Sequence, residues 1–170
     1  QPTGEVQEIG FRPMPTDKGR RHPVTATLTG IGDKGEAPAW GRWFRQIGVT
    51  GVKGDVLLRG AANGPLLITA RIDNGRVAQL LSDHAWLWTR GFEGGGPQAE
   101  LLRRIAHWLM QEPDLEEEDL RARANGNQLL IQRRSLTPAS GAVQVTTPSG
   151  EVRSITLKDN SRGLEVGALA

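Results

Sequence analysis

Residues 64–110 read GPLLITARIDNGRVAQLLSDHAWLWTRGFEGGGPQAELLRRIAHWLM, and this stretch decides the fold that the sequence predicts. Residues 65–72 form an apolar run, which is typical of a strand buried on both faces. Asp73-Asn74-Gly75 follows, and Asn and Gly accept the positive φ that a tight hairpin turn requires. Residues 77–81 therefore predict the returning strand of a hairpin.

The second half of this stretch predicts a helix over residues 97–111. Gly94-Gly95-Gly96 precedes Pro97, and proline suits the first position of a helix because its φ is already helical. Beyond it, apolar residues recur at helical spacing and predict a buried stripe; they are Leu101, Leu102, Ile105, Ala106, Trp108 and Leu109. We expect this helix to cover one face of the sheet.

The flanking sequence predicts two domains. Residues 43–50 and 55–59 have strand patterns, so residues 43–81 contain four consecutive predicted strands. After the acidic run at 114–119, hairpin turns at Asn125-Gly126 and Pro148-Ser149-Gly150 separate short strands with no helical pattern. We therefore predict an α/β portion over residues 1–112 and a small all-β, sandwich-like domain over residues 113–170.

Composition argues against several classes of function. The net charge is +2 and the basic pairs are scattered, whereas nucleic-acid binding requires clustered Lys and Arg. The chain has no cysteine, and its three histidines are too dispersed to predict a metal site. No apolar run is long enough to cross a bilayer, so we expect no membrane contact by this segment itself. Since the chain begins at Gln1, we expect it to be a soluble piece of a longer protein, and we expect no cofactor.

The polar corner after the second strand is the first candidate site. Asp83 and His84 stand at the carboxyl end of that strand, where α/β proteins place ligand sites, and the pair could bind a ligand or pass a proton. In the alternative interpretation, Ser82 or Asp83 caps a helix and His84 is a surface imidazole. The turn-forming residues here favour this second interpretation.

Aromatic and glycine residues next to the corner complete the candidate site. Trp86 and Trp88 lie two residues apart, so an extended chain would place both on one side, either as a binding platform or as core. Gly95 and Gly96 could cradle an anion at the helix start. Because no phosphate-binding motif surrounds them, a flexible lead-in to the helix is favoured.

The pattern PLLITARIDNGRVAQLLSDHAWLWTRGFEGGGPQAELLRRIAHWL resembles the glutamine-amidotransferase-like domain of bacterial membrane-anchored proteins. HPVTATL and WGRWFRQI, upstream, also resemble pieces of that domain, and the resemblance covers roughly residues 20–112. It implies a partial flavodoxin-like, class I amidotransferase-like α/β fold. It also implies a parent protein anchored in the bacterial inner membrane, with this part facing the periplasm.

The sequence departs from that family at the residues that carry its chemistry. An active class I amidotransferase uses a cysteine nucleophile and a histidine oriented by a carboxylate. This chain has no cysteine, and the family's His-x-Glu pattern would match His84 with Trp86 in place of the acid. Asp83 would point away from His84 if the strand continued.

These departures predict a non-catalytic scaffold or recognition module of a larger, envelope-associated bacterial protein. Its partners would be proteins or a small-molecule ligand. The alternative is part of a glutamine-amidotransferase-like hydrolase whose nucleophile lies upstream of Gln1. A third possibility is a carbohydrate- or peptide-binding module that uses Trp86 and Trp88.

Overall fold

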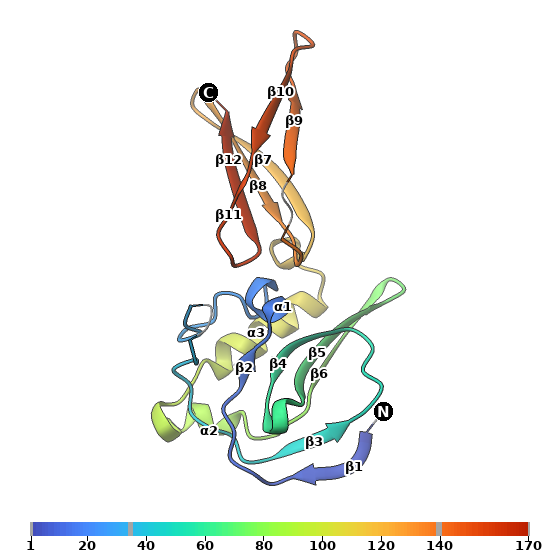
Figure 1. Cartoon of the computed structure of the whole chain (residues 1–170), viewed down its shortest axis with the longest axis vertical. Coiled ribbons are helices and arrows are strands. Elements are labelled where there is room, and N and C mark those ends of the chain that lie inside the picture. Colours follow the sequence, from blue (N-terminus) through green and yellow to red (C-terminus); the bar gives the residue numbers. More distant parts are fainter. Residues whose placement is uncertain (1, 34–35, 139–140, 170) are drawn as a thin grey trace.

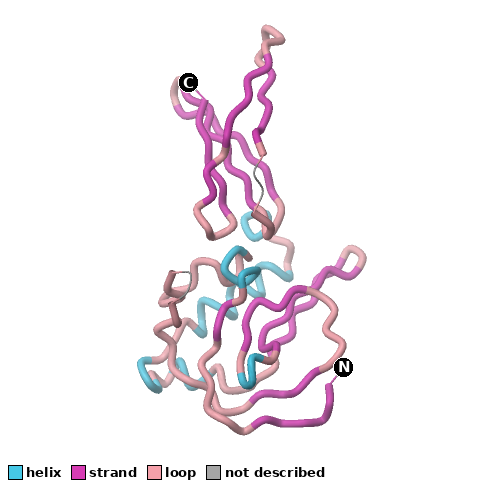
Figure 2. The backbone as a smooth tube through the Cα atoms, in the orientation of Figure 1, coloured by secondary structure: helices cyan, strands magenta, loops and turns pink. Residues whose placement is uncertain are grey.

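The computed structural model describes residues 2–33, 36–138 and 141–169, and most of its regular elements are strands (Figures 1 and 2). In the N-terminal part, up to residue 112, a four-stranded antiparallel sheet has the order β2-β4-β5-β6. Its strands are β2 (Met14–Pro15), β4 (Asp55–Arg59), β5 (Pro65–Ile72) and β6 (Gly75–Leu80). A second antiparallel pair consists of β1 (Pro2–Gln7) and β3 (Gln46–Val49).

The β1–β3 pair continues the curve of the four-stranded sheet. The Ile47 N–H donates to the Leu81 carbonyl at 2.9 Å, immediately after β6 ends. At the other end, Phe11 bridges Trp43 before the chain enters β2. The loop from Thr50 to Gly54 then leaves β3 and arches over the sheet to reach β4 (Figure 1). The strands thus form a strongly curved layer with a hollow on one side.

Short helices and one longer helix surround this layer. They are α1 (Asp17–Arg21), η1 (Ala61–Asn63), α2 (Trp86–Thr89), η2 (Phe92–Gly94) and α3 (Gln98–Leu109). Leu101 and Trp108 on α3 are buried against the Leu67 side of β5, as predicted, whereas Leu102, Ala106 and Leu109 of the predicted buried stripe are exposed. No helix in the described ranges is long and apolar enough to span a bilayer.

Tryptophans fill the rest of the core in the N-terminal part. The rings of Trp43 and Trp88 are 4.7 Å apart and those of Trp40 and Trp88 are 5.3 Å apart. Trp40 Nε1 donates to the Thr29 carbonyl and Trp88 Nε1 donates to the Gly41 carbonyl, both at 2.8 Å. Residues 22–33 and 36–45 form hardly any regular structure, so these two hydrogen bonds help to fix the long loop over the core.

The C-terminal part is built from strands after η3 (Pro113–Leu115). Its four-stranded antiparallel sheet has the order β11-β12-β8-β7, from strands β7 (Asp119–Asn125), β8 (Gln128–Arg134), β11 (Lys158–Asp159) and β12 (Leu164–Leu169). A separate hairpin joins β9 (Ala142–Thr146) to β10 (Val152–Thr156), with Ile155 buried close to Gly167 on β12.

The predicted fold class is wrong. Every strand pair is antiparallel, so residues 1–112 are not a flavodoxin-like α/β domain. The physical reason is in the connections: β5 and β6 are joined by a two-residue turn, which forces antiparallel pairing, whereas a parallel pair needs a long crossover. The described residues of 113–170 form a four-stranded antiparallel sheet and a separate hairpin, and after η3 they contain no helix, in agreement with an all-β part; its sandwich-like arrangement stays a prediction. The division at residue 112 stays a prediction.

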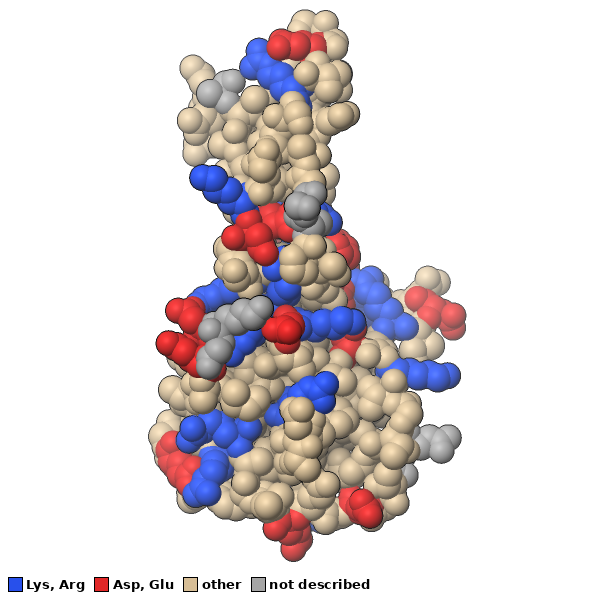
Figure 3. Space-filling view, viewed as in Figure 1, with Lys and Arg blue, Asp and Glu red and all other residues tan. Residues whose placement is uncertain are grey.

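The two parts meet through buried charge. Arg21, at the end of α1, is 7% exposed; its Nε donates to the Ser135 carbonyl at 3.0 Å and its Nη1 lies 2.7 Å from Asp159 Oδ2. Its Nη2 lies 3.7 Å from Glu165, which is 2% exposed. Gly163 has no room for a Cβ because the Arg21 carbonyl occupies that space. Charged side chains gather around this waist in Figure 3.

We predict that Arg21→Met lowers the free energy of unfolding by about 3 kcal/mol, because Glu165 would keep a buried charge without one of its two arginines. Urea unfolding of both proteins measures the difference. Lys18→Met is the matched control: its ion pair with Asp55 is exposed, so the cost should stay below about 1 kcal/mol. Equal effects of the two substitutions would contradict a structural role for Arg21.

Candidate functional site

The predicted polar corner is a tightly bonded turn. Ser82 Oγ donates to the Arg45 carbonyl at 2.6 Å and accepts the His84 N–H at 3.1 Å. Ser82 therefore ties the chain after β6 to the segment before β3. The N-cap of α2 is Ala85, which has no capping side chain, so neither Ser82 nor Asp83 caps this helix.

His84 is held by the backbone rather than by an acid. Its Nδ1 accepts the Phe44 N–H at 3.1 Å, which assigns the neutral tautomer with the proton on Nε2. Asp83 has a side chain that is 65% exposed, and its Oδ1 is 4.0 Å from His84 Nε2. Its other oxygen lies 3.4 Å from Arg45. Asp83 therefore does not orient the imidazole in the way that a catalytic carboxylate would.

The two tryptophans of the candidate site point in different directions. Trp86 is 51% exposed, whereas Trp88 is 3% exposed and belongs to the tryptophan core. The segment is helical here, and residues two apart on a helix lie on nearly opposite sides. The prediction that both indoles share one side assumed an extended chain. Trp86 remains at the surface, with its ring 6.3 Å from that of His84.

Gly95 and Gly96 pack on Trp88. Gly95 has a φ of +74°, and its carbonyl accepts the Gly41 N–H at 2.7 Å. A Cβ at Gly96 would overlap the Trp88 indole. The glycines are thus needed for close approach to a buried ring, and the backbone here lies against Trp88 rather than around an open anion site.

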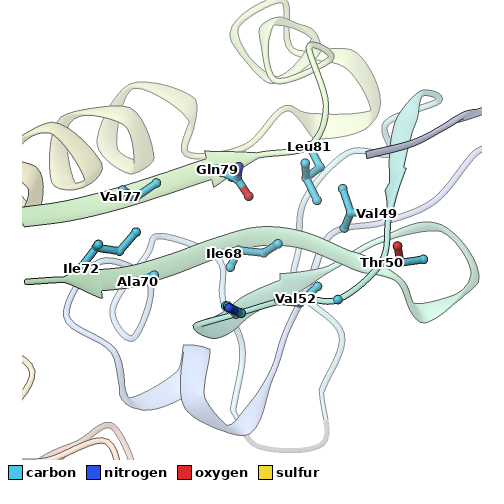
Figure 4. Close-up of a pocket in the computed structure, with 11 residues that line it drawn as sticks. Val49, Thr50, Val52, Ile68, Ala70, Ile72, Val77, Gln79 and Leu81 are labelled. Carbon is cyan, nitrogen blue, oxygen red and sulfur yellow. The ribbon is translucent and has the colours of Figure 1, made fainter. Parts of the chain in front are cut away.

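An apolar groove on the sheet is the second candidate. It occupies about 550 Å³ between the face of β5 and β6 and the loop that follows β3 (Figure 4). Ile68, Ala70 and Ile72 form one row along β5, and Val77, Gln79 and Leu81 form a row beside it. The loop contributes the opposite wall, which consists of Val49, Thr50, Gly51, Val52 and Lys53.

The groove is apolar, elongated and open to solvent. Its mouth includes Ile72 and Val77, which are 59% and 40% exposed, while Ile68 at its floor is buried. Lys53 is its single charged lining residue. The alternation of side chains along β5 and β6 explains the arrangement: the Leu67 side packs on α3 and the Ile68 side lines the groove.

Sequence reasoning missed this groove because it interpreted residues 65–72 as buried on both faces. The period-two pattern of Val77 and Gln79 marked one side of the hairpin. This pattern could not show that the loop after β3 covers only part of that side and leaves a groove. The polar corner and the groove are separate: Asp83, His84 and Trp86 do not line it.

A buried ionic cluster joins the linker to the sheet and α3. Glu117 Oε1 accepts the Trp108 Nε1–H at 2.9 Å and lies 3.3 Å from His22 Nε2, and Arg71 pairs with its other oxygen. His22 Nδ1 accepts the Val24 N–H at 3.1 Å, so the imidazole presents an Nε2–H to Glu117. Among the described residues, no group of three metal-ligand side chains converges.

This cluster shifts the pKa of both of its titratable members. Burial lowers the pKa of His22 below 6.5, although Glu117 opposes the shift. Burial alone would raise the pKa of Glu117, but the contact with His22 and the hydrogen bond from Arg71 outweigh it and hold the pKa well below 4.5. At neutral pH the cluster therefore holds a neutral imidazole and an ionised carboxylate.

Comparisons with known proteins return no match: no protein-family model, no curated protein and no solved structure matches the chain. The resemblance to the amidotransferase-like family therefore stays a prediction, and the flavodoxin-like fold that it implied is wrong.

We predict that Gly96→Ala lowers the free energy of unfolding by about 1–3 kcal/mol, because the new methyl group overlaps the Trp88 indole. Gly141→Ala is the matched control, since a Cβ there meets nothing within 4 Å. Its effect should stay within about 0.5 kcal/mol. Urea unfolding followed by tryptophan fluorescence measures both. An unchanged stability of Gly96→Ala would refute the close packing of this glycine on the ring.

We also predict that stability falls on acidification from pH 7 to 5.5 by roughly 1 kcal/mol. Unfolded His22 takes up a proton near pH 6.5 whereas the folded site resists it, so the unfolded state binds more protons below that pH. Unfolded Glu117 protonates near pH 4.5 whereas the folded site does not, so further acidification lowers stability again. Urea unfolding at a series of pH values measures this slope.

Substitutions of single histidines show which residue causes this change of stability with pH. His22→Asn should make the change between pH 7 and 5.5 shallower, whatever it does to absolute stability. His107→Gln, at the half-exposed histidine of α3 that pairs with Glu112 outside this cluster, is the comparison substitution. If the free energy of unfolding of His22→Asn depends on pH as strongly as that of the original chain, a requirement of the fold for neutral His22 is not the cause.

Proposed function

We propose that this chain is a non-catalytic recognition module of a larger protein, and that its groove binds a short, extended apolar segment of a protein partner. The observation that carries this proposal is the uncovered apolar face of β5 and β6. A face of this kind in a monomeric domain usually marks an interaction site, because leaving it in water is unfavourable.

The shape of the groove supports an extended peptide. Its two rows of side chains run along β5 and β6 in Figure 4, so the trough is linear. Extended chains place alternate side chains on one face at regular spacing, which matches such rows. β6 is also the last strand of its sheet. Within the described ranges, the backbone of residues 75–80 makes no hydrogen bond on the side away from β5, and only Leu81, just after the strand, accepts one there. Peptides commonly add to edges of this kind.

The charge of the groove further restricts the class of partner segment that fits it. Lys53 stands at the loop wall, no carboxylate lines the groove, and no ion pair among the described residues involves Lys53. A partner segment with aliphatic side chains and an acidic flanking residue fits this surface.

A non-catalytic role is supported by the contacts of the polar corner. His84 uses Nδ1 to accept a backbone hydrogen bond, and Asp83 points toward solvent and Arg45. The sequence resemblance adds that the larger protein is bacterial and associated with the envelope. A tryptophan platform has less support, because Trp88 lies in the core and leaves Trp86 alone at the surface.

Selection of displayed random nine-residue peptides on the intact chain tests the proposal. Enriched peptides should alternate apolar residues. Synthetic versions should bind at least about tenfold more weakly to Ala70→Trp, which fills the groove, and to Val77→Glu, which charges its mouth. Calorimetry of each variant measures these affinities, and circular dichroism shows whether each variant keeps its fold.

Trp86→Ala is the control, because Trp86 is exposed and lies outside the groove. It should leave peptide affinity unchanged. Two outcomes would overturn the proposal: no sequence is enriched, or the selected peptides bind both groove variants as tightly as the original chain.

A further inference from the structure

The outward face of the C-terminal sheet carries a cluster of arginines. Asp119 faces Arg134 across the β7–β8 ladder, and Arg121 faces Gln132. Side chains directly opposite one another share a face of the sheet, so these four lie together. With Arg123, Asp114 and Leu164 they line a polar cavity of about 190 Å³ next to η3.

Arg134 makes no direct ion pair with either carboxylate of this cavity, although Asp119 and Asp114 are close enough to attract it. Arg121 already binds both acids: its Nη1 lies 2.7 Å from Asp114 Oδ1 and its Nε lies 2.5 Å from Asp119 Oδ2. Within the part of the chain that the structure describes, no hydrogen bond or ion pair involves the guanidinium of Arg134. The nearby Arg104 is bonded to Glu100 on its own helix.

The surroundings of Arg134 destabilise the positive charge of its guanidinium group. Its side chain is half-buried, and burial together with the positive charge of Arg121 lowers its pKa below 12.5, although the charges of Asp119 and Asp114 oppose the shift. Three guanidinium groups line the cavity against two carboxylates. A partly desolvated cation in this position is stabilised by any anion that can reach it.

We propose that this cavity binds a phosphate-like oxyanion through Arg134, with Arg123 and Gln132 as further donors. The planar guanidinium matches two oxygens of such an anion at once. A volume of about 190 Å³ is several times that of one water, which takes about 30 Å³. The direct ion pairs of Asp114 and Asp119 are with Arg121, so neither carboxylate occupies the hydrogen-bond donors of Arg134.

Isothermal titration of the intact chain in low-salt buffer tests this site. The two probes are inorganic phosphate and phosphoserine, which separate a free anion from a phosphoryl group carried by a partner. Binding of either probe is expected. Arg134→Gln should weaken it about tenfold to a hundredfold, because a hydrogen-bonded charge pair is lost.

Arg103→Gln is the matched control, since Arg103 is an exposed arginine on α3 outside the cavity. It should leave affinity unchanged, and circular dichroism should show both variants folded. The inference is overturned if neither probe binds, or if Arg134→Gln binds the probes as tightly as Arg103→Gln does.

Discussion

The arrangement of the N-terminal part depends on one constraint: α3 can cover only one face of the β5–β6 hairpin. The helix buries Leu101 and Trp108 against the side of the sheet that carries Leu67. Alternate residues of the same strands must then point away from the helix. Apart from Gln79 these residues are also apolar, so the fold leaves a hydrophobic surface that Val49 of β3 and the loop after β3 cover in part. The groove is thus a direct consequence of an apolar hairpin with a single covering helix.

The local elements could be predicted from the sequence, whereas their arrangement could not. The hairpin turn and the helix depend on a few neighbouring residues, and both elements are confirmed. The positive φ of the turn falls on Asp73 rather than on Asn74 or Gly75, and of the predicted buried stripe only Leu101 and Trp108 are fully buried. The error in fold class came from residues 65–72. A strand that is apolar on both faces has the same sequence pattern in two different structures: one in which helices cover both sides of the sheet, and one in which one side faces a groove. Trp88 became core because a short helix turned it inward, and its partners Trp40 and Trp43 are distant in sequence.

The charged residues of the acidic run had a role that composition concealed. Residues 114–119 appeared to be a solvated linker, yet Glu117 is buried among Trp108, His22 and Arg71. Asp114 and Asp119 hold Arg121 at the base of the C-terminal sheet. Glu117 and Asp114 have partners from other elements, and no local sequence rule identifies such partners, whereas Asp119 pairs with Arg121 two residues on in the same strand. The same network also explains why Arg134 makes no direct ion pair among the described residues, because Arg121 pairs with both nearby acids.

The groove and the linker share one strand, so they are mechanically connected. Arg71 points toward the linker and pairs with Glu116 and Glu117, while the next residue, Ile72, lines the groove. Since successive residues of a strand face opposite sides, a displacement of Arg71 also displaces Ile72. Lys53 and Ala70 likewise border both the groove and the cavity beside the linker. Arg71 and Ile72 thus place the attachment of the linker and one wall of the groove on adjacent residues of the same strand.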